Sequence, residues 1–362
     1  MYKNGLVLMT AMPPTHGHLA LIDFAVNYVG SYGDHRGDGT VFVVVSTREC
    51  EPLEGFGRFA ALMHATSKMG NVVVLHSKGD VPQNPSEHPD FWNFWKDHIN
   101  GLLKGLYDPF KPDDLLFASE MYGEPLAEVM DMQFIPYDVQ RNIVDTKASR
   151  VRDSMLRYWP DIIPEYQARI RQTVTIFGAE SCGKTTMTKL LGETEYSPGH
   201  MLCTTVPEWA RLYLETVGPT VDEKAMDRIM RGQFAVQISA RNRAITPFIV
   251  QDTDLLSTIG YYRIMGIPVP DDILELFDYT YTNSGLYIMM NSNIPFEADP
   301  LRYGGDKRES TDQFWIDLLE EFQCKYYVVT NTNVDLQYVE IREQMENHFN
   351  ARFPDLATFV RT

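Results

Sequence analysis

Cysteine, long apolar runs and basic residues are all scarce in this sequence. The 362 residues include four cysteines, which lie far apart without a C-x-x-C pair: Cys50, Cys182, Cys203 and Cys324. This spacing excludes a disulfide scaffold and indicates a reduced, cytoplasmic protein. No apolar run approaches the roughly 20 residues that span a bilayer, and the N-terminus lacks the basic and apolar segments of a signal peptide. We therefore expect no membrane partner.

The charge balance is acidic. Lysine and arginine total 32 residues against 49 aspartates and glutamates, which gives a formal net charge of −17. Binding to duplex nucleic acid needs a basic face, so we expect no nucleic-acid partner. Nucleotides stay open as ligands, because a few backbone amides, one lysine, an arginine and Mg²⁺ can hold a triphosphate inside an acidic protein. The length favours two globular domains.

A glycine-rich loop stands between an apolar run and a helical pattern near the middle of the chain. Residues 173–177 suit a buried strand, and Gly178-Ala-Glu-Ser-Cys-Gly-Lys-Thr185 follows with the pattern G-x-x-x-x-G-K-T. In this pattern backbone N–H groups bind phosphate, the lysine reaches the β- and γ-phosphates, and the threonine ligates Mg²⁺. The strand–loop–helix order favours a P-loop over a plain glycine turn. The predicted ATP-binding residues are Gly178, Ser181, Cys182, Gly183, Lys184, Thr185 and Thr186, with Lys184 catalytic.

The first half of the chain alternates strand-like and helical patterns. Strand-like runs cover residues 5–11, 40–46, 71–76, 114–118 and 132–136, and helical patterns cover residues 19–29, 57–69, 91–106 and 125–129. This alternation predicts a parallel sheet, whose ligands bind beyond the carboxyl ends of its strands. The turn Pro13-Pro-Thr-His-Gly-His18 lies at such an end, where a histidine can hydrogen-bond a phosphate. A proline–glycine turn with solvated histidines is the alternative.

A second phosphate-binding pattern closes the same half. Thr146-Lys-Ala-Ser-Arg-Val-Arg152 combines small residues, hydroxyls and two arginines at a predicted helix start. With the turn at residues 13–18, it resembles the nucleotidyltransferase superfamily that includes nicotinamide mononucleotide (NMN) adenylyltransferases. Followed directly by a P-loop, the layout is similar to that of the NadR-type family, in which an NMN adenylyltransferase is fused to a nicotinamide riboside kinase. We expect this sequence to have no counterpart of the helix-turn-helix that some members carry.

The resemblance implies site residues in the N-terminal half. Its predicted ATP-binding residues are Met12, Thr15, His18, Ser149 and Arg152, of which Thr15, His18 and Arg152 are also expected to be catalytic. Trp92 or Trp95 would stack on the cationic nicotinamide ring of NMN. Their three-residue spacing equally suits core packing on one helix face.

The N-terminal motif departs from the family pattern. Met9 and Ala11 stand where the signature usually has glycine and phenylalanine, and Thr15 replaces its first histidine. One alternative therefore makes this half a non-catalytic nucleotide sensor beside an active P-loop nucleoside kinase. In another alternative the N-terminal half adenylylates a different phosphate substrate.

The resemblance also assigns a riboside site in the C-terminal half. In the stretch Val206-Pro-Glu-Trp-Ala-Arg211, Glu208 would bind the sugar hydroxyls and Arg211 the transferring phosphoryl group. A helix start with an ion pair is the alternative. Arg302 lies in a polar, glycine-rich stretch at residues 297–308, which would close over ATP as a lid. A plain solvated loop is the alternative there.

Two aspartates follow the apolar run at residues 247–251. An acidic residue at the end of this strand is the Walker B arrangement, which holds Mg²⁺. We assign Asp252 with Thr185 to the metal, and Asp254 to the riboside as a ligand or catalytic base. The reverse assignment of the two aspartates stays open, as does an aspartate turn that merely closes the strand.

The sequence therefore predicts an α/β protein of two domains, both with parallel sheets. Residues 1–160 would form a Rossmann-like nucleotidyltransferase and residues 168–362 a P-loop nucleoside kinase. The predicted enzyme phosphorylates nicotinamide riboside to NMN and then adenylylates NMN to NAD⁺ with release of pyrophosphate. ATP, NMN and nicotinamide riboside are its expected partners, with ATP as co-substrate and Mg²⁺ as cofactor. A homo-oligomer is left open.

Overall fold

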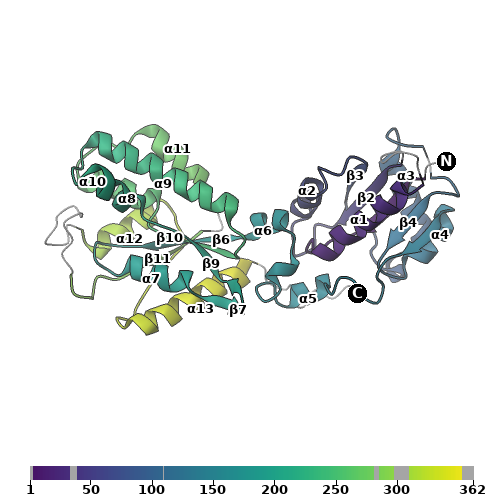
Figure 1. The fold of residues 1–362 in the computed structure, drawn as a ribbon. Helices are drawn as coiled ribbons and strands as arrows, with labels where there is room; N and C mark the ends of the chain where they lie inside the picture. The colour runs from purple at the N-terminus through teal and green to yellow at the C-terminus, as the bar shows by residue number, and fades with distance from the viewer. Residues whose placement is uncertain (1–2, 33–38, 109, 281–284, 297–309, 353–362) are drawn as a thin grey trace. The chain divides into compact units, whose positions relative to one another are not determined.

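The chain folds into two compact α/β units (Figure 1). The computed structural model describes residues 3–32, 39–108, 110–280, 285–296 and 310–352. One unit ends at Arg169, and the other runs from Ile170 to Arg352. Each unit contains a five-stranded parallel sheet with helices between its strands. The α/β class with two parallel sheets, which the sequence predicts, is confirmed.

The sheet of the first unit has the strand order β3-β2-β1-β4-β5. Its strands are β1 (Gly5–Met9), β2 (Val41–Thr47), β3 (Val72–Lys78), β4 (Leu115–Ala118) and β5 (Gln133–Pro136). The chain passes from β1 to β2 and β3 on one side, and then returns to β4 and β5 on the other. Ligands of such sheets bind beyond the carboxyl ends of the strands where this direction reverses, which here are those of β1 and β4.

Helices connect these strands at nearly the positions that the sequence predicts. They are α1 (His16–Gly30), α2 (Gly55–Ala65), α3 (Phe91–Leu103), α4 (Gly123–Met130) and α5 (Ala148–Asp153), with short 3₁₀ turns at Pro85–Glu87 and Trp159–Asp161. Helix α3 buries every fourth residue, namely Phe91, Trp95, Ile99 and Leu103. This stripe packs into the core with side chains from β1, β2, β4 and α4, because residues four apart share a helix face.

The segment after α5 belongs to the first unit. Ile162 and Ile163 are fully buried, Ile162 pairs with Thr15 in an isolated antiparallel bridge, and the Ile163 N–H donates to the Pro14 carbonyl. Helix α6 (Pro164–Ile170) then leads to the boundary. The first unit therefore extends through this segment to Arg169.

The sheet of the second unit has the order β12-β11-β6-β10-β9. Its strands are β6 (Gln172–Phe177), β9 (Cys203–Val206), β10 (Phe248–Asp252), β11 (Gly285–Met289) and β12 (Tyr326–Val328), and β7 (Glu195–Ser197) pairs with β8 (His200–Met201) as a separate hairpin. Its helices are α7 (Lys184–Gly192), α8 (Trp209–Val217), α9 (Glu223–Arg243), α10 (Leu255–Ile264), α11 (Asp271–Thr280), α12 (Asp312–Glu321) and α13 (Val334–Arg352). The central strand β6 ends at the glycine-rich loop.

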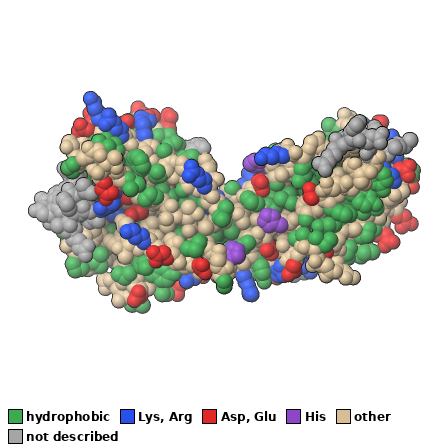
Figure 2. All heavy atoms as spheres, viewed as in Figure 1, with side chains coloured by type: hydrophobic (Ala, Val, Ile, Leu, Met, Phe, Trp, Pro, Cys, Tyr) green, Lys and Arg blue, Asp and Glu red, His purple; other side chains and the backbone are tan. Residues whose placement is uncertain are grey.

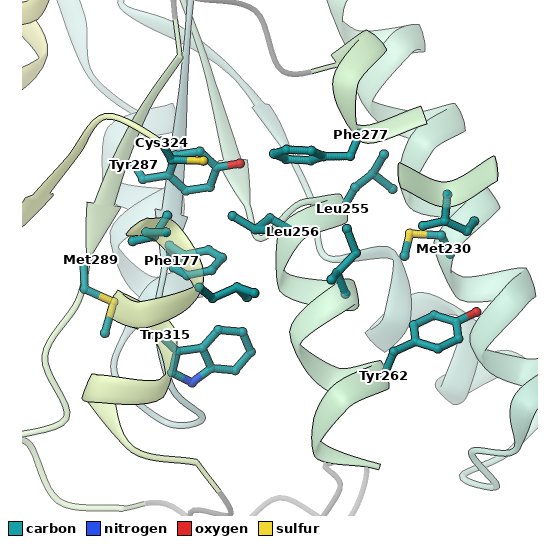
Figure 3. Packing of buried hydrophobic residues seen from close by; sticks show 14 of the residues in the cluster. Phe177, Met230, Leu255, Leu256, Tyr262, Phe277, Tyr287, Met289, Trp315 and Cys324 are labelled. Atoms are coloured by element: carbon teal, nitrogen blue, oxygen red, sulfur yellow. The ribbon is translucent and has the colours of Figure 1, made fainter. Parts of the chain in front are cut away.

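A cluster of aromatic and aliphatic side chains packs α9, α10, α11 and α12 against this sheet (Figure 3). Phe177, at the end of β6, contacts Tyr287 of β11 and Trp315 of α12 edge to face, with both ring centroids 5.2 Å away. Such aromatic contacts have a preferred geometry as well as a large buried area. The core therefore fixes the end of β6, from which the glycine-rich loop starts.

The surface carries both signs of charge. On the face drawn in Figure 2, lysine and arginine side chains are interspersed with aspartate and glutamate. Among the described residues, no helix is long and apolar enough to cross a membrane.

Candidate active sites

A cavity of about 640 Å³ lies beyond the carboxyl end of β1 in the first unit. Both sequence motifs contribute to its lining. The lining residues that the sequence predicts as site residues are Thr15, His18, Trp92, Trp95, Ser149 and Arg152. The topology and the motifs therefore point to the same place.

The start of α1 fixes the His18 ring. Its Nδ1 accepts the Thr15 backbone N–H at 3.0 Å and lies 2.8 Å from the Thr15 hydroxyl. With Nδ1 as the acceptor, the neutral ring carries its proton on Nε2, so Nε2 is a hydrogen-bond donor. Thr15 itself is buried. Thr15 therefore orients the histidine that would donate to a phosphate at this helix N-terminus.

Arg152 joins the two motifs. It is 9% exposed, and its guanidinium donates to the Met12 carbonyl at 2.5 Å. Met12 is buried and does not line the cavity, so its contact is with the arginine. A guanidinium carries five N–H donors in a planar fork, a geometry that suits an anion such as phosphate.

The two tryptophans of α3 differ. Trp95 is 3% exposed, and its indole N–H donates to the Pro82 carbonyl at 2.9 Å. Trp92 is half-buried and contacts Phe91 edge to face at 4.8 Å. Both line the cavity. Trp95 thus belongs to the core stripe of α3, and Trp92 has the more accessible ring.

Arg141 and Tyr122 are two lining residues that were not among the predicted site residues. Arg141 has a left-handed backbone with φ of 58° and donates to the Thr146 carbonyl at 3.2 Å. Tyr122 donates its hydroxyl to the Leu8 carbonyl, a contact between residues far apart in the sequence.

In the second unit, the loop from Gly178 to Lys184 has the backbone that its glycines allow. Gly178 and Gly183 have φ of +132° and +89°, and a Cβ on Gly178 would lie 2.7 Å from the Met290 carbonyl oxygen. The Lys184 ammonium donates to the carbonyls of Gly178 and Ala179 at 2.9 and 2.6 Å. The loop backbone therefore surrounds the Lys184 ammonium just before helix α7. This is the conformation of a phosphate-binding loop.

Thr185 and Asp252 lie together at the ends of α7 and β10. The Thr185 hydroxyl donates to Asp252 Oδ2 at 2.6 Å, and Asp252 is 3% exposed. No group of three or more His, Cys, Asp or Glu able to hold a metal occurs in the described residues. Mg²⁺ commonly takes one or two carboxylates and fills its other positions with water and phosphate oxygens. A hydroxyl and a carboxylate at this distance fit such a site.

The contacts of Asp254 differ from those expected of a riboside ligand or catalytic base. It caps α10 and accepts the Ser257 N–H at 3.2 Å and the Tyr287 hydroxyl. Burial raises its pKa to about 6, against the lowering effect of the hydrogen bonds from Tyr287 and Ser257. It is not among the residues that line the cavity of this unit. The role of Asp254 as riboside ligand or base stays a prediction, and its contacts are those of a helix cap.

A cavity of about 450 Å³ extends from the P-loop between α8, α9 and α10. The lining residues that the sequence predicts are Ser181, Cys182, Gly183, Lys184, Thr185, Thr186, Glu208 and Arg211. Arg211 also lies 3.8 Å from Glu215, one turn further along α8. Arg302 lies outside the described residues.

The lining residues that were not predicted include three polar side chains, those of Glu180, Gln233 and Tyr261. Burial, and next the nearby carboxylates of Glu180 and Glu208, raise the pKa of Tyr261 well above its usual value. Its hydroxyl therefore stays protonated and can donate at neutral pH. Glu180 is 4% exposed and accepts the Ser310 hydroxyl at 2.8 Å. The cavity thus combines phosphate-binding groups at the P-loop with carboxylates and an apolar wall.

Comparisons with known proteins find similar sequences and folds for both units. A family model described as an AAA domain matches residues 173–336, which include the P-loop and Asp252. The chain is 25% identical over 301 residues to the trifunctional NAD biosynthesis/regulator protein NadR of Escherichia coli (strain K12), covering 77% of this chain and 68% of that protein.

Solved structures extend the likeness to both units. A NadR protein in complex with NR is 19% identical, with a TM-score of 0.64 over 96% of each chain. A NadR protein in complex with NAD and AMP-PNP is 18% identical, with a TM-score of 0.64 over 96% of this chain and 97% of that one. In sequence and in fold, the chain resembles NadR proteins over most of its length. The His18 cavity lies in its first unit and the P-loop cavity in its second.

Proposed function

We propose that this chain makes NAD⁺ from nicotinamide riboside in two ATP-dependent steps. The second unit transfers the γ-phosphoryl group of ATP to the 5′-hydroxyl of the riboside, giving NMN and ADP. The first unit then joins NMN to the adenylyl group of a second ATP and releases pyrophosphate. Both steps are displacements at phosphorus, in which positioning and charge neutralisation account for most of the catalysis.

The kinase step takes place in the P-loop cavity. The riboside 5′-oxygen attacks the γ-phosphorus, the bond from that phosphorus to the bridging oxygen of ADP breaks, and the proton of the 5′-hydroxyl is released to solvent. Lys184 neutralises charge on the phosphoryl group, while loop N–H groups and the α7 N-terminus hold the phosphates. Glu208 binds the sugar hydroxyls and Arg211 the transferring phosphoryl. Support comes from their common lining of one cavity.

Thr185 and Asp252 are proposed to hold Mg²⁺ with the ATP phosphates. When bound there, the ion neutralises phosphate charge and orients the triphosphate. The hydroxyl-to-carboxylate distance of 2.6 Å supports this pairing. Asp254 takes no step in the proposal, because its carboxylate accepts hydrogen bonds from Ser257 and Tyr287 and caps α10.

The adenylyl transfer takes place in the cavity of the first unit. A phosphate oxygen of NMN attacks the α-phosphorus of ATP, and the bond to the pyrophosphate oxygen breaks. His18 donates from Nε2 to a phosphate oxygen, and Arg152, with the backbone near Ser149, binds the triphosphate. The accessible ring of Trp92 stacks on the cationic nicotinamide. The meeting of both motifs at this cavity supports these roles.

One observation carries the proposal: each unit has its own cavity lined by phosphate-binding groups, His18 and Arg152 in one and Lys184 and Thr185 in the other. The ligands of the solved NadR proteins, NR in one and NAD with AMP-PNP in the other, support the choice of substrates.

The test is to incubate the chain with nicotinamide riboside, ATP and Mg²⁺, separate the products by chromatography and assay pyrophosphate. NMN should form first, followed by NAD⁺ with one pyrophosphate for each. Formation of NMN without NAD⁺ or pyrophosphate would instead make the first unit a sensor. Phosphorylation of another nucleoside but not of nicotinamide riboside would overturn the substrate assignment.

A further inference from the structure

Helix α9 presents a single polar side chain to the P-loop cavity. The residues of α9 that line the cavity are Met226, Ile229 and Gln233, whose spacing places them on one face of the helix. Met226 and Ile229 are 3% exposed, and Gln233 is 2% exposed. Leu214 of α8 also contributes to this lining. A flat ring could pack against these apolar side chains, so the buried amide beside them needs an explanation.

A backbone contact fixes the direction of the Gln233 amide. Its Oε1 accepts the backbone N–H of Trp209, the first residue of α8, at 2.9 Å. An amide turned the other way would set two donors against each other. The carbonyl oxygen therefore faces α8, and Nε2 carries the two hydrogens on the other branch of the amide.

Gln233 Nε2 has no hydrogen-bond acceptor among the residues that the structure describes. A buried donor without a partner destabilises a fold, so such a group calls for a structural or functional explanation. Leucine or methionine would fill this position without that cost.

We propose that Gln233 recognises the base of the substrate. Its Nε2 donates a hydrogen bond to a carbonyl oxygen on a flat, otherwise apolar ring. The inference rests on the proposed function, and there the acceptor is the carboxamide oxygen of nicotinamide riboside. Met226 and Ile229 pack against the ring. A ring without an acceptor leaves the amide unpaired, and this difference is the source of selectivity.

The experiment compares two ribosides that differ by this group. Nicotinamide riboside carries the carboxamide, and pyridine riboside is the same pyridinium sugar without it. kcat/KM for phosphorylation is measured for both with the full chain at saturating ATP. The wild-type chain and the variants Gln233→Leu and Gln233→Glu are compared. Gln233→Glu keeps an acceptor for the Trp209 N–H and removes the donor, so it preserves the contact with α8.

The wild-type chain should favour nicotinamide riboside by about 10- to 100-fold. Gln233→Leu should lose this preference, with kcat/KM falling for nicotinamide riboside and changing by less than about threefold for pyridine riboside. Gln233→Glu should lose it as well, which covers the case in which Gln233→Leu fails to fold. Gln237→Leu is the matched control. Gln237 is a second buried glutamine of α9 that does not line the cavity, so its removal should leave the preference unchanged.

The possible outcomes distinguish a failure of the proposed function from a failure of the role proposed for Gln233. If the wild-type chain phosphorylates neither riboside, the proposed function is wrong and this inference fails with it. If it phosphorylates both equally well, only the role of Gln233 is wrong. If both Gln233 variants lose activity on the two ribosides by the same factor, Gln233 only holds α8 in place. That result would overturn the proposal that Gln233 recognises the base.

Discussion

Asp252 and Asp254 stand two residues apart at the end of β10, yet their carboxylates have different partners. Asp252 accepts the hydroxyl of Thr185 at 2.6 Å. Asp254 accepts from Ser257 and Tyr287 and caps α10. The first contact joins the strand to the P-loop helix, and the second stabilises a helix end. We therefore expect the two aspartates to differ sharply when each is replaced by asparagine.

Asp252→Asn should lower the kinase rate by about 10²-fold or more, because it removes the charge that would hold the metal. Asp254→Asn is the matched control, since asparagine is also a good N-cap and should maintain the start of α10. Rates are measured at several Mg²⁺ concentrations. A near-normal rate for Asp252→Asn with a large loss for Asp254→Asn would exchange the roles.

Glu340 holds the loop after β12. Its carboxylate accepts the N–H and hydroxyl of Thr330, the N–H and amide of Asn331 and the hydroxyl of Tyr327. Burial would raise its pKa, but these hydrogen bonds outweigh that effect and lower the pKa from 4.5 to about 2. No local sequence pattern indicates this residue, because its hydrogen-bond partners are set by the packing of α13.

The folded state therefore favours the charged form of Glu340. Its contribution to stability is present above pH 4.5 and is lost as the pH falls towards 2. We expect about 1–2 kcal/mol, because solvent screening reduces the effect. Glu340→Gln should flatten the pH dependence of the free energy of unfolding over this range, measured by denaturant titration. Glu343→Gln, at an exposed site on the same helix, should retain it; an unchanged profile for Glu340→Gln would contradict this account.

At the scale of elements, α8 and α9 meet at a glycine. A Cβ on Gly232 would lie 1.7 Å from Trp209 Nε1. This close contact lies next to Gln233, which accepts the Trp209 N–H. The glycine thus sets the distance between α8 and α9, which both line the P-loop cavity.

Gly232→Ala should destabilise the second unit by about 1–3 kcal/mol, because the clash exceeds the usual gain of alanine in a helix. Gly101→Ala is the control in α3, where a Cβ would meet nothing within 4 Å. That change should be neutral or stabilise by up to about 1 kcal/mol. Thermal unfolding measures both. A stabilising effect of Gly232→Ala would show that the helices can separate freely.

The sequence predicted elements best where the signal was local. Strand β2 is largely a continuous apolar run, and β6 alternates threonine with apolar residues. The glycine-rich loop follows β6 directly, and the turn at residues 13–18 follows shortly after β1. Strand β9 (Cys203–Val206) was missed as a strand, because it is short, rich in threonine and lies at the sheet edge. Gln233 was missed for a related reason: mid-helix residues become site residues only through the packing of other helices. A polar residue on the buried stripe of α9 was the available signal.

At the scale of the whole molecule, the account assigns one reaction to each unit. The first unit ends at Arg169, and each cavity is lined by residues of one unit alone. NMN made in the second unit would then be a free intermediate. This is the central claim, since the proposed function needs two complete sites rather than one.

The most direct measurement uses two single variants and their mixture, each supplied with nicotinamide riboside, ATP and Mg²⁺. Lys184→Ala should abolish riboside phosphorylation and leave NMN adenylylation intact. His18→Ala removes one donor to phosphate, a loss that typically costs about 10²–10³ in rate, so this variant should accumulate NMN. Mixing the two should restore NAD⁺ synthesis. A normal rate of NAD⁺ formation by His18→Ala alone, or a mixture that fails although each variant keeps its other activity, would contradict two independent sites.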